Sequence, residues 1–222
     1  MTQSIKRNKF CNLIKDIFFP VRCPYCQKVI DRNDYACNDC KKLFPQTSLK
    51  KYAAGGYLCS APFPYNGIYA GAVKRFKFSN RAGYAKQLAF PIVQSILEIH
   101  GNTHFDIITC VPMHKTMLKQ RRYNQAELLA RECAEIMDIP YIDTLEKFKM
   151  NKAQHSIKAA EREKNVKGVY RAVDKNSLQG KSILIIDDII TTGHTLGECS
   201  RILVKNGCKD VKCAVLCSVV ID

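Results

Sequence analysis

Residues 183–195 constrain the fold and the chemistry of this chain more than any other run. Four aliphatic residues predict a buried strand, which ends at the paired carboxylates of Asp187 and Asp188. A turn rich in hydroxyl groups and glycine follows, and it opens a helix near Thr195. Because open α/β sheets bind ligands where strands end and helices begin, this run predicts a ligand site.

The chemical groups in this run suit a phosphorylated ribose better than a bare phosphate. Free backbone N–H groups at a helix N-terminus bind phosphate, whereas two neighbouring carboxylates would repel it. Gly193 allows the backbone to approach phosphate oxygens, and both carboxylates can reach one sugar only where the strand is already turning. The plain alternative is a buried strand with an aspartate as helix cap. A cap, however, needs neither a second acid nor a Thr-Thr-Gly-x-Thr turn.

The same run resembles the 13-residue motif of the type I phosphoribosyltransferases, which bind phosphoribosyl pyrophosphate (PRPP). The resemblance implies that Asp187 and Asp188 hold the 2′- and 3′-hydroxyls of the ribose. It implies a 5′-phosphate site made of Thr191, Thr192, Gly193, His194 and Thr195. It also implies Mg²⁺ as the cofactor that accompanies PRPP.

A second segment supplies the groups that the pyrophosphate of PRPP would need. A predicted strand at residues 105–111 leads into a candidate pyrophosphate loop, made of Val111, Pro112, Met113, His114 and Lys115. Arg121 and Arg122 follow, and their guanidinium groups could neutralise diphosphate oxygens bidentately. We therefore predict a catalytic role for these two arginines in stabilising the departing diphosphate.

Four of the twelve cysteines have the spacing of a structural zinc site. They form two Cys-x-x-Cys pairs, Cys23 with Cys26 and Cys37 with Cys40. Two such turns supply the four thiolates of a tetrahedral Zn²⁺ site, and the metal would supply folding energy that so small a module cannot obtain from a core. A redox pair and a lost metal are the alternatives. Cys59 lies in a predicted loop and receives no role.

A motif at residues 118–130 narrows the resemblance. It is similar to the RGFNQAxxLA signature of the competence protein F (ComF) family, a branch of the phosphoribosyltransferases that includes proteins of natural transformation. The paired cysteines and the blocks at residues 65–78 and 154–166 also resemble this family, so the resemblance covers nearly the whole chain. Arg122 departs from the pattern, because the family commonly has glycine there.

Alternating strands and helices predict an α/β fold with a parallel sheet and right-handed crossovers. The resemblance implies the type I phosphoribosyltransferase fold, a parallel sheet flanked by helices with a hood, plus a small N-terminal zinc-ribbon-like module. We place an N-terminal helix and the four-cysteine zinc module in residues 1–52 and the phosphoribosyltransferase-like domain in residues 53–222. Helices are predicted at residues 81–100, 124–137 and 195–205, and strands at residues 105–111 and 211–219. Residues 141–143 fit a short strand or an edge segment. Residues 68–78 fit either a strand or a helix.

The net charge of +15 permits an interaction with polyanions without proving one. Possible nucleic-acid contacts are Lys74, Arg75, Lys77 and Phe78, which interleave cations with aromatic rings as single-stranded DNA binding requires. The alternatives are a solvated basic face without a partner and a strand whose aromatic residues are buried. No apolar stretch approaches the roughly 20 residues that span a bilayer, and residues 1–20 lack the continuous apolar core of a signal peptide. We therefore expect a cytoplasmic protein without membrane insertion.

Two functions remain as hypotheses. The first is a phosphoribosyltransferase-like protein that binds PRPP or a phosphoribosyl nucleotide with Mg²⁺ and acts in competence and DNA uptake. Its further partners would be single-stranded DNA and DNA-processing proteins. The alternative is an active phosphoribosyltransferase that transfers phosphoribose to an unknown nitrogen acceptor in nucleotide salvage. A glutamine amidotransferase is not expected, because the chain starts Met1-Thr2-Gln3 instead of with the nucleophilic cysteine of the related glutaminase domains.

Overall fold

The computed structural model of the chain describes residues 20–78, 81–150, 166–174 and 176–220. Its centre is a six-stranded sheet with the order β1-β2-β8-β7-β4, in which β3 also pairs with β8. The strands of this sheet are β1 (Leu49–Ala53), β2 (Tyr57–Ala61), β3 (Phe63–Pro64), β4 (Ile107–Cys110), β7 (Ser182–Ile190) and β8 (Asp210–Ser218). All its pairings are parallel except that of β1 with β2.

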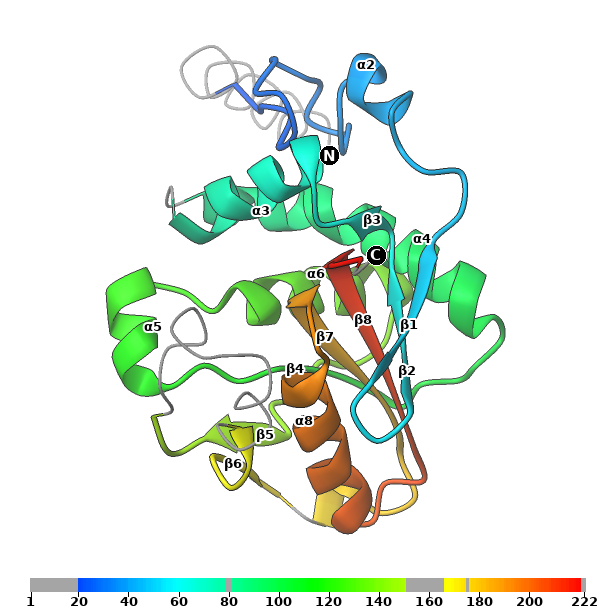
Figure 1. Ribbon diagram of the computed structural model, residues 1–222, viewed down its shortest axis with the longest axis vertical. Helices are drawn as coiled ribbons and strands as arrows, with labels where there is room; N and C mark the ends of the chain where they lie inside the picture. The colour runs from blue at the N-terminus through cyan, green and yellow to red at the C-terminus, as the bar shows by residue number, and fades with distance from the viewer. Residues whose placement is uncertain (1–19, 79–80, 151–165, 175, 221–222) are drawn as a thin grey trace, which may run out of the picture.

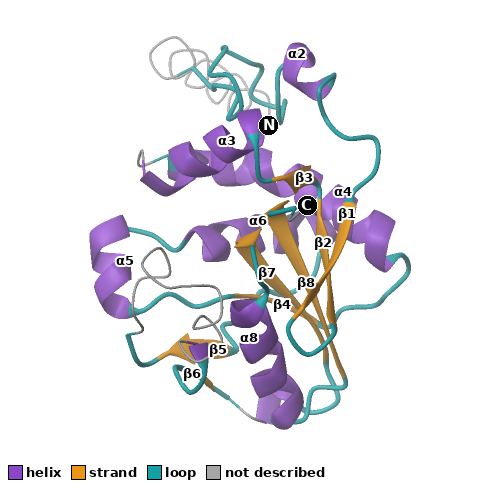
Figure 2. Ribbon diagram, in the orientation of Figure 1, coloured by secondary structure: helices purple, strands orange, loops and turns teal. Residues whose placement is uncertain are grey.

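Helices cover both faces of this sheet (Figures 1 and 2). The helices are α2 (Asn38–Lys41), α3 (Gly67–Phe78), α4 (Ala85–His100), α5 (Lys115–Arg121), α6 (Gln125–Met137) and α8 (His194–Lys205). Two short 3₁₀ turns, η1 (Ala82–Tyr84) and η4 (Asn176–Leu178), and a small sheet of β5 (Leu145–Lys147) and β6 (Tyr170–Ala172) complete the described elements. The sheet with helices on both faces confirms the predicted α/β architecture.

Strand β7 separates two hydrophobic cores because successive side chains of a strand point to opposite faces. Leu184 and Ile186 pack with α4 and α6 on one face. Ile183 and Ile185 pack with α8 on the other. The continuous aliphatic run therefore reflects burial on both faces, as in other parallel sheets.

The predicted helices at 81–100, 124–137 and 195–205 are confirmed within a few residues. In α6, the Asn124 side chain accepts a hydrogen bond from the Ala126 N–H at 3.2 Å and so caps the helix. Residues 68–78, which fitted a strand or a helix, form α3. Its buried residues are Tyr69, Ala72, Val73 and Phe76, which have helical spacing.

Some expectations about strands are wrong. β7 does not end at the paired acids but continues to Ile190, because Ile189 and Ile190 extend the parallel ladder with Cys217 and Ser218 of β8. Residues 141–143, expected as a short strand or an edge segment, are an edge segment that forms a single bridge from Tyr141 to Ile108. Cys59 is fully buried in β2 instead of lying in a loop, since β1 and β2 form a hairpin on the sheet edge.

The cysteine module packs directly on the rest of the protein. Buried Cys23, Tyr25 and Cys40 belong to the same hydrophobic core as Phe63 and Tyr69. The expected boundary near residue 52 falls inside β1, and the division into two domains stays a prediction. The expected N-terminal helix and the block at residues 154–165 lie outside the described residues. Among the described helices, none is long and apolar enough to cross a membrane.

Candidate functional site

A cavity of about 420 Å³ lies at the carboxyl end of β7; we call it the β7 cavity. Both halves of the predicted site line it. From the motif come Asp187, Asp188, Thr191, Thr192, Gly193, His194 and Thr195, and from the other half Val111, Pro112, Met113, His114 and Arg121. Lys115 and Arg122 are not among the described residues that line the cavity. The sheet thus brings together two segments that are far apart in sequence.

The two carboxylates differ in their surroundings. The Asp187 Oδ1 atom accepts a hydrogen bond from the Asp188 backbone N–H at 2.8 Å. The Asp188 Oδ2 atom forms an ion pair with Lys77 Nζ, also at 2.8 Å. Burial raises the pKa of Asp187 to about 7, and the negative charge of Asp188 adds to the rise, while Lys77 and Lys147 oppose it. The Asp187 carboxyl is therefore poised to change its charge near neutral pH.

The turn between β7 and α8 is fixed by the β1–β2 hairpin. Gly193 has a left-handed φ of 75° and caps α8, and its carbonyl accepts a hydrogen bond from the Ala54 N–H at 3.2 Å. A Cβ atom at Gly193 would lie 2.7 Å from the Ala53 Cα, and one at Gly197 would lie 2.2 Å from the Ala54 carbonyl oxygen. These glycines are required by the hairpin's close approach, a reason that the motif alone did not reveal.

The candidate pyrophosphate loop leads from β4 into α5. His114 caps this helix, because its Nδ1 atom accepts a hydrogen bond from the Thr116 N–H at 3.3 Å. Arg121, at the end of α5, points its Nη1 atom to the Gln125 Oε1 atom at 3.4 Å. The predicted loop thus lies at the cavity, with one of the two predicted arginines beside it.

Arg122 occupies a different environment from Arg121. It is exposed and has a left-handed φ of 69° as the C-cap of α5. Glycine adopts this conformation without strain, whereas a side chain disfavours it. This geometry gives a physical reason for the glycine that the competence protein F pattern has at this position. The catalytic role of Arg122 stays a prediction, and Arg122 is not among the described residues that line the cavity.

Five further polar residues line the cavity and were not assigned to it from the sequence: Lys77, Asn124, Gln125, Lys147 and Tyr170. Burial lowers the pKa of Lys147, whose ammonium lies 5.4 Å from the centre of the Tyr170 ring. Lys147 and Tyr170 come from paired strands β5 and β6, which no sequence pattern marked. Lys77 was assigned to nucleic-acid binding because its neighbours are basic and aromatic.

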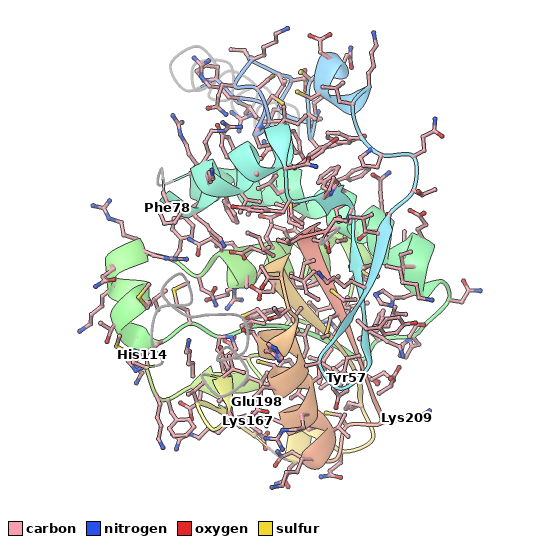
Figure 3. The ribbon with its side chains drawn as sticks, viewed as in Figure 1. Tyr57, Phe78, His114, Lys167, Glu198 and Lys209 are labelled. Atoms are coloured by element: carbon pink, nitrogen blue, oxygen red, sulfur yellow. The ribbon has the colours of Figure 1, made fainter. Side chains whose placement is uncertain are left out.

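The four residues proposed for nucleic-acid contacts have separate environments along α3. Arg75 donates hydrogen bonds to the backbone carbonyls of Pro24 and Tyr25, and Lys77 pairs with Asp188. Lys74 is exposed. Phe78 is 68% exposed at the outer end of α3 (Figure 3). Only Lys74 and Phe78 therefore face solvent in the way that a nucleic-acid contact needs.

The four predicted zinc ligands lie together. All the Sγ atoms of Cys23, Cys26, Cys37 and Cys40 lie within 4.8 Å of one another, and those of Cys26 and Cys37 are 3.4 Å apart. A tetrahedral site with Zn–S bonds of about 2.3 Å separates its sulfur atoms by roughly 3.8 Å. The residues present therefore fit a Zn²⁺ ion.

The comparisons with known proteins agree with this geometry. A family model described as the phosphoribosyl transferase domain matches residues 124–220. Competence protein F of Haemophilus influenzae is 29% identical over 195 residues, which are 86% of this chain and 81% of the relative. The chain is thus similar to the ComF-like family of phosphoribosyltransferase-like proteins. Its fold is that of the type I phosphoribosyltransferases, with a zinc-ribbon-like module of four cysteines at the N-terminal end.

Two other relatives match this chain over a shorter stretch. DNA utilization protein YhgH of Salmonella typhi is 30% identical over 149 residues, which are 65% of each protein. Competence protein ComFC of Bacillus subtilis is 28% identical over 145 residues, or 65% of this chain and 57% of the relative. The chain therefore matches less than two thirds of the length of these two relatives.

Proposed function

We propose that the β7 cavity binds PRPP or a phosphoribosyl nucleotide with Mg²⁺. The observation that carries this proposal is that the paired carboxylates, the turn at residues 191–195 and the candidate pyrophosphate loop line one cavity. Carboxylate oxygens accept hydrogen bonds from sugar hydroxyls, and the N-terminus of α8 attracts the 5′-phosphate. Bound Mg²⁺ would neutralise charge on the diphosphate.

The residues around the cavity suit such a ligand. Asp187 and Asp188 would accept hydrogen bonds from the 2′- and 3′-hydroxyls, because both line the cavity although β7 continues past them instead of turning there. Thr191, Thr192 and Thr195 would donate from their hydroxyls to the phosphate. Arg121 lies beside the candidate pyrophosphate loop and would contribute the positive charge that a diphosphate needs.

We place this binding activity in competence and DNA uptake, with single-stranded DNA as a further partner. The names of the relatives, competence protein and DNA utilization protein, support the process. The net charge of +15 supports the partner. Exposed cations of the described residues on and just after α3 and around α5 would contact the DNA in this proposal: Lys74, Arg81, Lys115, Lys119 and Arg122. The guanidinium of Arg121 lies 5.4 Å from the centre of the Phe78 ring, so α5 adjoins the end of α3.

Calorimetric titrations test the two parts separately. The full-length protein is titrated with PRPP and Mg²⁺, ribose 5-phosphate, inorganic phosphate and a short single-stranded oligonucleotide. We expect PRPP and ribose 5-phosphate to bind more tightly than phosphate. Equal affinity for all three would contradict a ribose site. We expect the oligonucleotide to bind with a steep salt dependence, and binding that is insensitive to salt would contradict phosphate contacts.

Turnover is a second candidate function, favoured by the position of Arg121 at the cavity. An active enzyme would break the bond between C1 of the ribose and the pyrophosphate and form a new bond to a nitrogen acceptor. The test offers PRPP, Mg²⁺ and a panel of nitrogen bases and measures released pyrophosphate. Release that depends on the base and falls at least about a hundredfold in Arg121→Ala would support transfer. Binding without release would leave the protein a phosphoribosyl-binding protein.

A further inference from the structure

Helix α3 joins the cysteine module to the β7 cavity. It lies between the module and the edge at which β7 and β8 end (Figure 1). Arg75 faces the module and Lys77 faces the cavity. Residues two apart on an α-helix do not share a face, so one short helix presents a cation to each region. Each of these two cations is engaged by a specific set of acceptors.

The Arg75 side chain donates hydrogen bonds to the backbone of the first cysteine pair. Its Nε and Nη2 atoms donate to the Pro24 carbonyl at 3.0 and 2.9 Å, and Nη2 also donates to the Tyr25 carbonyl at 2.7 Å. Pro24 and Tyr25 are the two residues between Cys23 and Cys26. These carbonyls are therefore oriented by the same turn that orients two of the four thiolates.

Other contacts hold the same surfaces together. The Tyr84 hydroxyl donates to the Gln27 Oε1 atom at 3.0 Å, just beyond the first cysteine pair. The Tyr69 hydroxyl donates to the Leu43 carbonyl, just beyond the second. Arg75 and Tyr69 thus hold α3 itself to the module, whereas Tyr84 holds the η1 turn, and Arg75 is the contact nearest to Lys77 in sequence.

Lys77 is held at the carboxylates in a largely enclosed position. Its side chain is 18% exposed and that of Asp188 is 13% exposed. Breaking an enclosed ion pair on one side leaves the remaining charge poorly compensated. Without Lys77, the cavity would present two adjacent carboxylates to a ligand that itself carries phosphate. Lys77 therefore reduces the negative charge of the cavity, which favours binding of an anionic ligand.

We propose that Lys77 is a binding residue of the phosphoribosyl site and that the cysteine module, through Arg75, is what positions it. This inference rests on the proposed function. When the module holds zinc, the turn from Cys23 to Cys26 is fixed and its carbonyls stay aligned with Arg75. When the turn is released, Arg75 loses its acceptors and α3 loses the contact nearest to Lys77. Ligand affinity in the cavity thereby depends on the state of the distant module.

The test measures the affinity of ribose 5-phosphate, without Mg²⁺, for zinc-loaded variants whose zinc content is measured. We expect Lys77→Met to weaken binding roughly tenfold and Lys77→Arg to retain most of it. Arg75→Met should weaken binding by a similar factor, and the double variant should bind no more weakly than Lys77→Met alone. Lys86→Met, which removes an exposed lysine of α4, is the matched control and should stay within about twofold. If Arg75→Met does not fold, Arg75→Lys replaces it.

Zinc removal provides the second arm, in which folding is followed by circular dichroism. Removing zinc from the wild-type protein with a chelator should weaken binding by the factor measured for Lys77→Met, and added zinc should restore it. In Lys77→Met the same treatment should change affinity little. Two results would overturn the inference. One is a Lys77→Met variant that binds ribose 5-phosphate as tightly as the wild-type protein. The other is a double variant whose loss of affinity equals the product of the losses in Arg75→Met and Lys77→Met. If the wild-type protein binds neither ribose 5-phosphate nor PRPP, the proposed function fails and this inference fails with it.

Discussion

The cavity takes its charges from two regions that are held in place by different means. Asp187 and Asp188 lie within β7, whose ladder with β8 continues on both sides of them. Lys77 lies on α3, a covering helix that is anchored to the cysteine module through Arg75. The carboxylates are thus fixed by the central sheet, whereas their counter-ion depends on a module outside it. In this account the positions of the two carboxylates stay the same, whereas the position of Lys77 changes with the state of the cysteine module.

The largest expected loss of ligand affinity comes from changes to the two acids of β7. Replacing both acids, Asp187→Asn and Asp188→Asn, should weaken binding of PRPP with Mg²⁺ by at least about a hundredfold. The reason is that hydrogen bonds to charged acceptors contribute roughly 1.5–3 kcal/mol each. Calorimetric titration measures the loss. Glu135→Gln, which removes one exposed acid, is the control. Retained affinity in the double variant would place the ligand elsewhere.

A smaller effect should appear where the β1–β2 hairpin fixes the motif turn. Gly197→Ala should destabilise the protein by about 1–3 kcal/mol, because the new methyl group would collide with a backbone carbonyl. The same substitution in an unobstructed helix would stabilise it by up to about 1 kcal/mol. Gly83→Ala, where nothing lies within 4 Å of the new atom, is the control. Chemical denaturation gives both values, and equal stabilities would show that the hairpin does not pack on α8.

The raised pKa of Asp187 predicts a stability difference that depends on pH. The folded state holds this proton more tightly than the unfolded chain, so ionisation costs stability increasingly as the pH rises from about 4 to about 7. Asp188, Lys77 and Lys147 are the charged groups around it. Asp187→Asn should therefore be more stable than the wild-type protein at pH 8, by about 1–2 kcal/mol after allowance for water in the cavity. The difference should vanish near pH 4. Denaturation curves with the same difference at every pH would contradict the raised pKa.

The smallest expected effect lies at the end of α5. Arg122→Gly should stabilise the protein by about 1 kcal/mol, because it removes a side chain from a left-handed backbone position. Gln120→Gly, two residues earlier and inside the helix, should instead destabilise the protein. Thermal unfolding distinguishes the two variants. Loss of stability in Arg122→Gly would mean that the arginine makes contacts that outweigh its strain.

The strand region could be predicted from the sequence because its information is local. The aliphatic run, the two acids and the turn follow one another at residues 183–195, and each predicts its own structure. The residues that contact or support this region from elsewhere in the chain could not be predicted from a local pattern. Lys77 and Arg75 lie in a basic and aromatic block that is equally typical of nucleic-acid binding. Their true roles depend on which elements the fold places on either side of α3.

The β1–β2 hairpin was missed for a related reason. Gly55 and Gly56 indicate a flexible linker as readily as a tight turn, and here both adopt the positive φ values of a turn. The need for a glycine at position 193 or 197 is likewise invisible until Ala53 and Ala54 are placed against α8. Close approaches between distant segments are set by the packing of the whole chain, which a single local motif does not encode.

The most direct test of whether the paired carboxylates bind ribose hydroxyls compares the affinities of two sugar phosphates for the cavity. Ribose 5-phosphate and 2-deoxyribose 5-phosphate are titrated into the wild-type protein and into the Asp187→Asn, Asp188→Asn variant. We predict that the wild-type protein binds ribose 5-phosphate at least about tenfold more tightly than the deoxy sugar, and that the variant does not distinguish them. Equal affinities in the wild-type protein would contradict the assignment of the paired carboxylates to the ribose hydroxyls.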